Sequence, residues 1–159
     1  MLEAARDLLR AVASAWPAVW RTTLLAWVPQ TVIWYVVVSV YPGPVLEEVF
    51  ASLVWTVVLA LVIGPVVETM LQALVLWALR RCLADSPRVV WYSALFFGAL
   101  HFPSSTWGLH AIWAFYVFSR LYLVQSKHST WRAIWMTTLV HSGCNLLSYI
   151  GTLIWRSMG

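Results

Sequence analysis

Four side chains that could move a proton or hold a developing charge stand on three separate apolar stretches of this sequence. Glu68 lies in the long apolar run from Val49 to Leu83, and His101 ends the stretch FFGALHF. His141 and Asn145 begin and end HSGCN. Placing an ionisable side chain in the core of a lipid bilayer costs at least about 2.5 kcal/mol of free energy. Glu68 is therefore a functional candidate, and its partners are sought on the other two stretches.

Each stretch carries one pair of residues four positions apart, and residues at this spacing share a helix face. The pairs are Glu68 with Gln72, Phe97 with His101, and His141 with Asn145. At 1.5 Å per residue, the candidate side chains lie roughly 14 to 20 Å from the nearest arginines that end their spans. We expect Glu68, His101, His141 and Asn145 to meet in one polar layer, with Gln72 and Phe97 in support.

Such a layer has the groups that amide hydrolysis requires. A carboxylate beside an imidazole can hold and deprotonate a water molecule. A second imidazole and a carboxamide can donate hydrogen bonds to a developing oxyanion. One Glu and two His could instead ligate zinc, although the sequence contains no HExxH motif. Each polar residue could also serve structure alone, as a buried acid, a helix cap or a hydrogen bond between helices.

The composition indicates a membrane protein. The chain has 159 residues, of which 62% are hydrophobic and 10% are charged, and it contains 12 Trp. A soluble domain of this size could not bury so much apolar surface. The net charge of +4 comes from basic residues at the ends of apolar runs, which indicates membrane topology and no nucleic-acid partner. Cys82 and Cys144 form no CxxC pattern and predict no disulfide framework.

The predicted fold is an all-α, multi-pass transmembrane helical bundle in the lipid bilayer. Residues 1–16 are expected to form an interfacial amphipathic helix, and residues 17–159 the bundle, with about five crossings. The expected spans are Val19–Val40, Val49–Leu83, Arg88–Phe102, Trp107–Gln125 and Trp131–Trp155. Gly64-Pro65 should break the second of these into two halves. This segment then crosses once as a broken helix or twice around a tight break, and the sequence leaves both open.

The basic residues favour the single crossing, because all of them except Arg156 then lie on one side of the membrane. The connections 41–48 and 103–106 on the other side contain Glu47 and Glu48 and no Lys or Arg. The N-terminus is therefore expected in the cytoplasm. The polar layer would lie in the outer half of the bilayer, where it would meet a translocated substrate.

The three motifs together resemble those of the CPBP intramembrane proteases, which include the CAAX endopeptidases. The matching stretches are ETMLQ at 68–72, FGALH at 97–101 and HSGCN at 141–145, and the resemblance covers about residues 50–150. It implies a glutamic-type intramembrane endopeptidase in which Glu68 and His101 activate water. It also implies that His141 and Asn145 form the oxyanion site, and that no metal is needed.

Two positions depart from the usual EExxxR motif of that family. Thr69 replaces the second glutamate, and Ala73 replaces the arginine, whose role Gln72 could partly fill. This variant resembles the myxosortase-like branch, which processes C-terminal sorting tags. The resemblance therefore implies a membrane-anchored protein substrate, cleaved near its C-terminal segment, and a location in the bacterial cytoplasmic (inner) membrane.

Two other functions remain open. A non-catalytic membrane protein, such as an immunity or scaffold factor, could use the same polar residues for structure. A zinc-dependent CAAX-type protease could use Glu68, His101 and His141 as ligands. Cys144 is expected to be a packing residue, since the sequence shows no activation of its thiol beyond the neighbouring His141. His110 and His128 are not expected to be catalytic.

Overall fold

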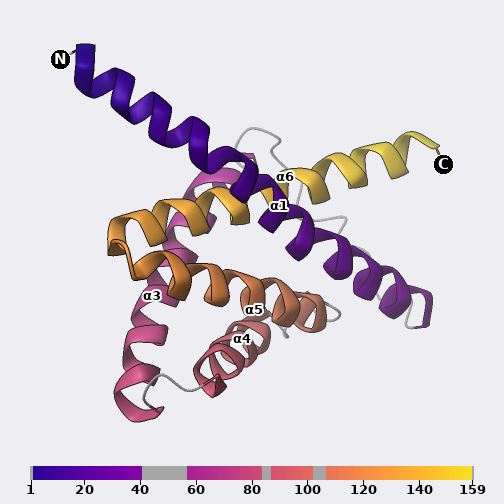
Figure 1. The fold of residues 1–159 in the computed structure, drawn as a ribbon. Helices are drawn as coiled ribbons and strands as arrows, with labels where there is room; N and C mark the ends of the chain where they lie inside the picture. The colour runs from indigo at the N-terminus through magenta and orange to yellow at the C-terminus, as the bar shows by residue number, and fades with distance from the viewer. Residues whose placement is uncertain (1, 41–56, 84–86, 102–106, 159) are drawn as a thin grey trace.

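The computed structural model describes residues 2–40, 57–83, 87–101 and 107–158. That part of the chain contains five long helices and one short π-helical turn. They are α1 (Leu2–Val40), α3 (Gly64–Leu83), α4 (Arg88–His101), α5 (Trp107–Ser126) and α6 (Thr130–Met158), and the π-helical turn is η2 (Leu59–Ile63). No strand occurs in these ranges. The predicted all-α bundle is confirmed, and Figure 1 shows its arrangement.

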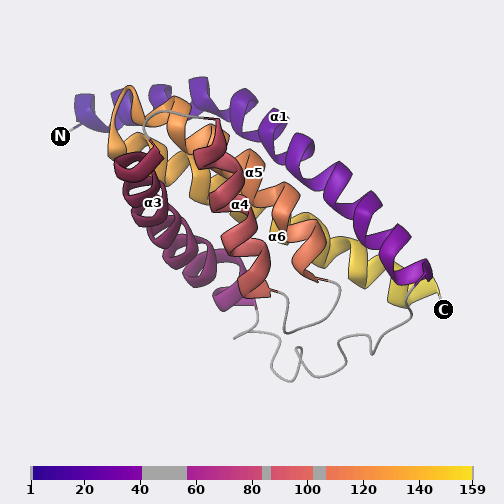
Figure 2. The same ribbon diagram turned by 90° about the horizontal axis from the view of Figure 1, so that it is seen from below.

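Helix α5 lies at the centre of the bundle. It packs against α1, α4 and α6, whereas α3 packs mainly against α4 and α6. Figure 2 shows α1 and α3 flanking the other helices on opposite sides. The predicted connection 41–48 and the loop 103–106 lie outside the described residues.

Leu59–Leu83 is long and apolar enough to cross a membrane, with a mean hydropathy of 2.0 over its most apolar window. It is the one such helix in the described part of the chain. Only 22% of that window is buried within the protein. Most of its apolar surface therefore faces outward, as the surface of a helix in contact with lipid would.

Helix α1 continues across the predicted boundary between an interfacial helix and the first span. It runs from Leu2 to Val40 and contains both Pro17 and Pro29. Ala15 and Val19 flank Pro17 and are both buried in the core, so packing against the bundle holds the chain helical there. The position of residues 2–16 at the membrane interface stays a prediction.

The helix predicted to break at Gly64-Pro65 is continuous there. What changes at this point is its backbone hydrogen bonding, from a π-helical to an α-helical pattern. The chain is helical from residue 57 to Leu83, and the π-helical turn η2 ends where α3 begins at Gly64. The Gly64 N–H donates to the Leu59 carbonyl, five residues back. A Cβ at Gly64 would lie 2.8 Å from that carbonyl oxygen, so only glycine fits there. Because residues 57–83 form one continuous helix, two crossings around Gly64-Pro65 are excluded.

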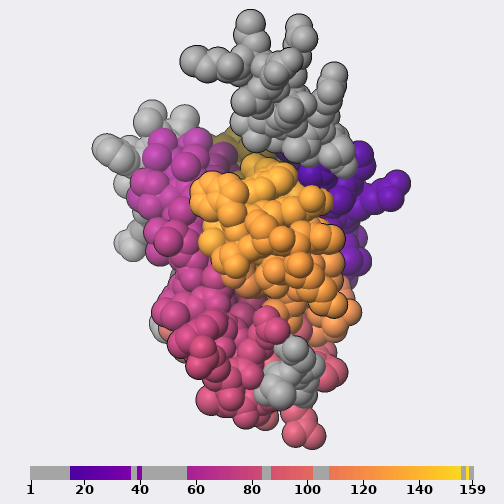
Figure 3. All heavy atoms as spheres, turned by 60° about the vertical axis from the view of Figure 1, so that its left-hand side comes forward, coloured from indigo at the N-terminus to yellow at the C-terminus, as the bar shows by residue number. Residues whose placement is uncertain are grey.

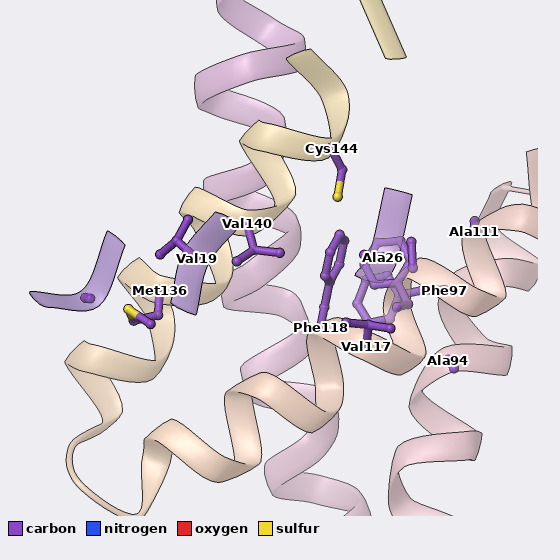
Figure 4. Packing of buried hydrophobic residues seen from close by; sticks show 13 residues of the cluster. Val19, Ala26, Ala94, Phe97, Ala111, Val117, Phe118, Met136, Val140 and Cys144 are labelled. Carbon is purple, nitrogen blue, oxygen red and sulfur yellow. The ribbon is translucent and has the colours of Figure 1, made fainter. Parts of the chain in front are cut away.

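The main core lies where α1, α4, α5 and α6 meet. Phe118 of α5 is 1% exposed and packs in one cluster with Ala26 of α1, Phe97 of α4 and Val140 of α6. Figure 4 shows the side chains of these four residues directed toward one another. A smaller cluster joins α3, α4, α5 and α6 through Leu76, Val89, Tyr122 and Ala133.

The second proline of α1 creates a link between helices. Pro29 has no N–H, so the Leu25 carbonyl four residues earlier loses its usual helical donor. The indole Nε1–H of Trp113 on α5 donates to this carbonyl at 3.1 Å. A backbone carbonyl at membrane depth must be satisfied within the protein. Here the missing bond within α1 becomes a bond between α1 and α5.

Helices α4 and α5 approach each other closely at Gly98. A Cβ there would overlap the Ile112 side chain and lie 3.1 Å from the Gly108 carbonyl oxygen. Gly98 follows Phe97, whose ring stacks on Phe115 of α5 with centroids 4.3 Å apart. The small residue therefore sets the spacing between the two helices.

We predict that Gly98→Ala lowers stability by about 1–3 kcal/mol, as overpacking of a tight contact does. Gly151→Ala is the matched control, because a Cβ at Gly151 meets nothing within 4 Å and Ala favours helix. Thermal unfolding in detergent would measure both. Equal midpoints for the two variants would show that the α4–α5 contact at Gly98 is not tight.

Candidate functional site

Glu68 lies one helical turn after the π-helical turn and faces α6. Its Oε2 atom is 3.7 Å from Nε2 of His141. That oxygen is buried, and no described residue forms a hydrogen bond with it. The Glu68 side chain as a whole is 35% exposed, whereas that of His141 is 9% exposed. The carboxylate thus points into the bundle at a place where it can accept a further hydrogen bond.

His101, at the end of α4, completes a group of three ionisable side chains. It lies close enough to interact electrostatically with both Glu68 and His141. Its Nδ1 is 2.7 Å from the Phe97 carbonyl oxygen. A carbonyl oxygen only accepts, so Nδ1 carries a proton, and in the neutral imidazole the lone pair then lies on Nε2. The FxxxH spacing therefore fixes this histidine in the tautomer that a general base requires.

Two phenylalanines of α5 form the wall between the histidines, and sequence reasoning did not find them. The Phe115 ring lies 5.5 Å from His101 and 5.6 Å from His141, centroid to centroid. The Phe118 ring lies 4.7 Å from His141. Both rings are almost fully buried. No motif marks them, because α5 is apolar along most of its length and contains aromatic residues at many positions.

Asn145 is placed by the π-helical turn and does not contact Glu68 through any described hydrogen bond. Its Nδ2 donates to the Ala60 carbonyl at 2.7 Å. This carbonyl has no backbone donor, because the Gly64 N–H bonds Leu59 and Pro65 has no N–H. An amide nitrogen has two N–H groups. The bond to Ala60 therefore orients the amide of Asn145 and leaves its second N–H for another acceptor.

Gln72, predicted as a supporting residue, joins three helices. It is fully buried on α3, and its Nε2 donates to Ser119 Oγ at 2.9 Å and to the Phe115 carbonyl at 3.3 Å on α5. Ser119 Oγ in turn donates to Ser93 Oγ of α4 at 3.0 Å. Gln72 thus positions the helix that carries the aromatic wall. Thr69 is also buried beside it, and its hydroxyl has no hydrogen-bond partner among the described residues.

The other thiol and imidazole groups lie apart from this arrangement. Cys144 is buried, and its Sγ lies 3.6 Å from the Thr23 carbonyl oxygen of α1. His110 is buried near the start of α5, and His128 is exposed in the turn before α6.

The described side chains do not form a metal-binding set. Within residues 2–40, 57–83, 87–101 and 107–158, no three His, Cys, Asp or Glu side chains gather as ligands. Metal independence stays a prediction.

Comparison with known proteins identifies one family. The family model described as type II CAAX prenyl endopeptidase Rce1-like matches residues 50–147, which is more than half of the chain. The match contains all three motifs and ends just after HSGCN. Searches of curated proteins and of solved structures find no match.

The bond between Asn145 and the Ala60 carbonyl leads to a testable prediction. Asn145→Ala should cost about 0.5–1.5 kcal/mol, because it removes the side-chain donor of the Ala60 carbonyl. Pro65→Ala supplies a backbone N–H at position 65, which can donate to that carbonyl. The cost of Asn145→Ala should therefore shrink in the Pro65→Ala background.

Thermal unfolding of the four proteins in this double-mutant cycle would measure the coupling. A parallel cycle with Trp113→Phe and Pro29→Ala tests whether Pro29 likewise creates the need for the hydrogen bond from Trp113 to α1. If Asn145→Ala costs the same in both backgrounds, the proline does not create the need for the asparagine.

Proposed function

The chain belongs to the type II CAAX prenyl endopeptidase Rce1-like family, and from this membership we propose that Glu68 and His101 activate the water that cleaves a peptide bond. The coarser activity follows from the family itself: the protein is an intramembrane protease, and its substrate is a membrane-associated protein. The observation that carries the finer proposal is the grouping of Glu68, His101 and His141 from three different helices.

In the proposed mechanism, Glu68 and His101 hold one water molecule between them. The buried Oε2 of Glu68 and the lone pair of His101 Nε2 are the two acceptors that could take its hydrogens. As the water oxygen attacks the scissile carbonyl carbon, its proton moves to one of these groups. The same proton then goes to the leaving amine nitrogen as the C–N bond breaks. No covalent intermediate with the protein forms.

His141 and Asn145 are proposed to stabilise the oxyanion of the tetrahedral intermediate. They lie four residues apart on one face of α6. The Ala60 carbonyl holds the Asn145 amide in place, and Phe115 and Phe118 hold the His141 ring. Donors that are fixed before the reaction stabilise developing charge most effectively, because they need no reorganisation. The second N–H of Asn145 is the one available for the substrate oxygen.

We propose that this chemistry proceeds without a metal, as in a glutamic-type protease. The support is the resemblance of the three motifs, which assigns His141 to the oxyanion site and so leaves two candidate ligands, Glu68 and His101, where a zinc site needs at least three. A metal-dependent enzyme would need the side chains of Glu68, His101 and His141 all directed at one ion. Further residues would have to form hydrogen bonds with these ligands and hold them in place. Chelator treatment followed by metal analysis of active protein distinguishes the two mechanisms.

The proposed substrate is the C-terminal sorting tag of a membrane-anchored protein. Thr69 and Ala73 replace the glutamate and arginine of the usual family motif, and this difference is our reason for proposing a substrate other than a prenylated peptide. Gln72 binds α5 and so helps to place the aromatic wall. With the predicted topology, the depth count from the arginines supports a site in the outer half of the bilayer, where a translocated C-terminus would arrive.

We predict that Glu68→Gln reduces cleavage by about 10²–10⁴-fold, the usual contribution of a general base. Cys144→Ala is the matched control, since Cys144 lies on α6 within the same motif but faces α1. It should keep most of the activity. Cleavage of a tagged reporter coexpressed in membranes would measure both, with thermal unfolding to show that each variant folds. Full function of Glu68→Gln would favour an immunity or scaffold protein.

The proposed orientation can be tested with a native residue. Cys82 is exposed near the arginine-rich end of α3, whereas Cys144 is buried. With the N-terminus in the cytoplasm, a membrane-impermeant maleimide should label Cys82 in inside-out vesicles and not in intact cells. Cys82→Ser is the control for specificity. Labelling in intact cells would place the arginines outside and contradict cleavage of translocated tags.

A further inference from the structure

A cavity of about 720 Å³ lies at the opposite end of α3 from the candidate active site. Its lining residues come from the last turns of α3, the end of α5 and the start of α6, and they are Ala73, Leu74, Leu76, Trp77, Arg80, Arg81, Tyr122, Leu123, Ser126 and Thr130. Arg80 lies twelve residues after Glu68, which is about 18 Å along the helix. Figure 3 shows this side of the molecule, where α3 (magenta) borders the end of α5 and the start of α6 (orange).

The wall that α3 contributes changes from apolar to cationic along the helix. Ala73 and Leu74 lie nearer Glu68, Trp77 follows one turn later, and Arg80 and Arg81 come last. These residues repeat at intervals of three and four, so they form one continuous helix face. Leu74 and Trp77 are 58% and 56% exposed, although both are apolar. An apolar strip that ends in two cations matches an amphiphile, with chains along the strip and an anion at the arginines.

The opposite wall supplies polar groups at the level of the arginines. Ser126 ends α5, and Thr130 begins α6. Ser129 caps this helix, because its Oγ accepts a hydrogen bond from the Arg132 N–H at 3.0 Å. The first turn of a helix carries a partial positive charge, which favours a nearby anion. None of the described residues that line the cavity is acidic.

Arg81 and Trp77 are already arranged for a ligand at the membrane surface. The Arg81 guanidinium lies over the Trp77 ring, 4.8 Å from its centroid. This contact holds the charge beside the apolar strip and leaves the edge of the guanidinium for hydrogen bonds with an anion. Tryptophan also favours the level of lipid headgroups.

We propose that this cavity binds an anionic phospholipid, with its phosphate at Arg80 and Arg81 and its acyl chains along Leu74 and Trp77. Basic pockets between membrane helices are suited to acidic headgroups. A soluble phosphate would use the arginines but not the exposed apolar strip, so the strip identifies a lipid as the occupant. This site is separate from the proposed peptidase site and does not depend on it.

Native mass spectrometry of the protein in detergent can test the proposal with phosphatidylglycerol and phosphatidylcholine of the same chain length. The wild type should retain phosphatidylglycerol in preference, and the preference should weaken at high salt. R80Q/R81Q should reduce its apparent affinity about 30-fold, at about fivefold for each arginine near the surface. R120Q/K127Q is the matched control, because it removes the same charge from exposed positions that do not line the cavity.

A second variant covers the case in which the arginine variant fails to fold. Thr130→Glu adds a negative charge to the cavity at the first turn of α6, where an acidic residue favours the helix. It should also weaken phosphatidylglycerol binding while the protein stays folded. Equal losses in R120Q/K127Q and R80Q/R81Q would overturn the proposal, as would equal retention of phosphatidylcholine. Binding of glycerol phosphate as tight as that of the lipid would overturn the role of the apolar strip.

Discussion

A proline inside a helix leaves a carbonyl without its donor, and this chain satisfies two such carbonyls from other helices. Pro29 frees the Leu25 carbonyl, which Trp113 binds, and Pro65 leaves the Ala60 carbonyl to Asn145. Without these contacts, each carbonyl would lack a hydrogen-bond donor from the protein. The prolines therefore convert bonds within one helix into bonds that tie α1 to α5 and the start of α3 to α6.

The second of these ties places the candidate site. Asn145 reaches the π-helical turn, and His141, one turn earlier on α6, then lies beside Glu68, one turn after Gly64. Helix α5 completes the arrangement without contributing an ionisable group to it. Its aromatic residues separate the histidines, and its hydrogen bonds with Gln72 hold α3. The chemistry thus depends on a helix that carries none of the three motifs.

Helix α3 presents different chemistry at its two ends. Glu68 lies near the beginning, in a setting formed by two histidines and aromatic rings, whereas Arg80 and Arg81 border an open cavity near the end. An apolar strip connects the two regions on the exposed surface of the helix. The length and composition of Leu59–Leu83 suit a membrane span. Proteolysis and lipid binding would then occupy different depths of the same bilayer.

Local sequence patterns determined much of the helical structure of this protein. Apolar length and the arginines at span ends predicted the helices from residue 88 to the C-terminus within a few residues, and four-residue spacing placed each polar pair on one face. Only the tertiary structure showed the features that depend on contacts between helices. Packing of Ala15 and Val19 keeps α1 continuous, and a π-helical turn replaces the expected break because Asn145 satisfies its carbonyl. The contacts of Phe115 and Phe118 with the histidines could not be read from the sequence, because an apolar helix does not show which of its faces a partner will cover.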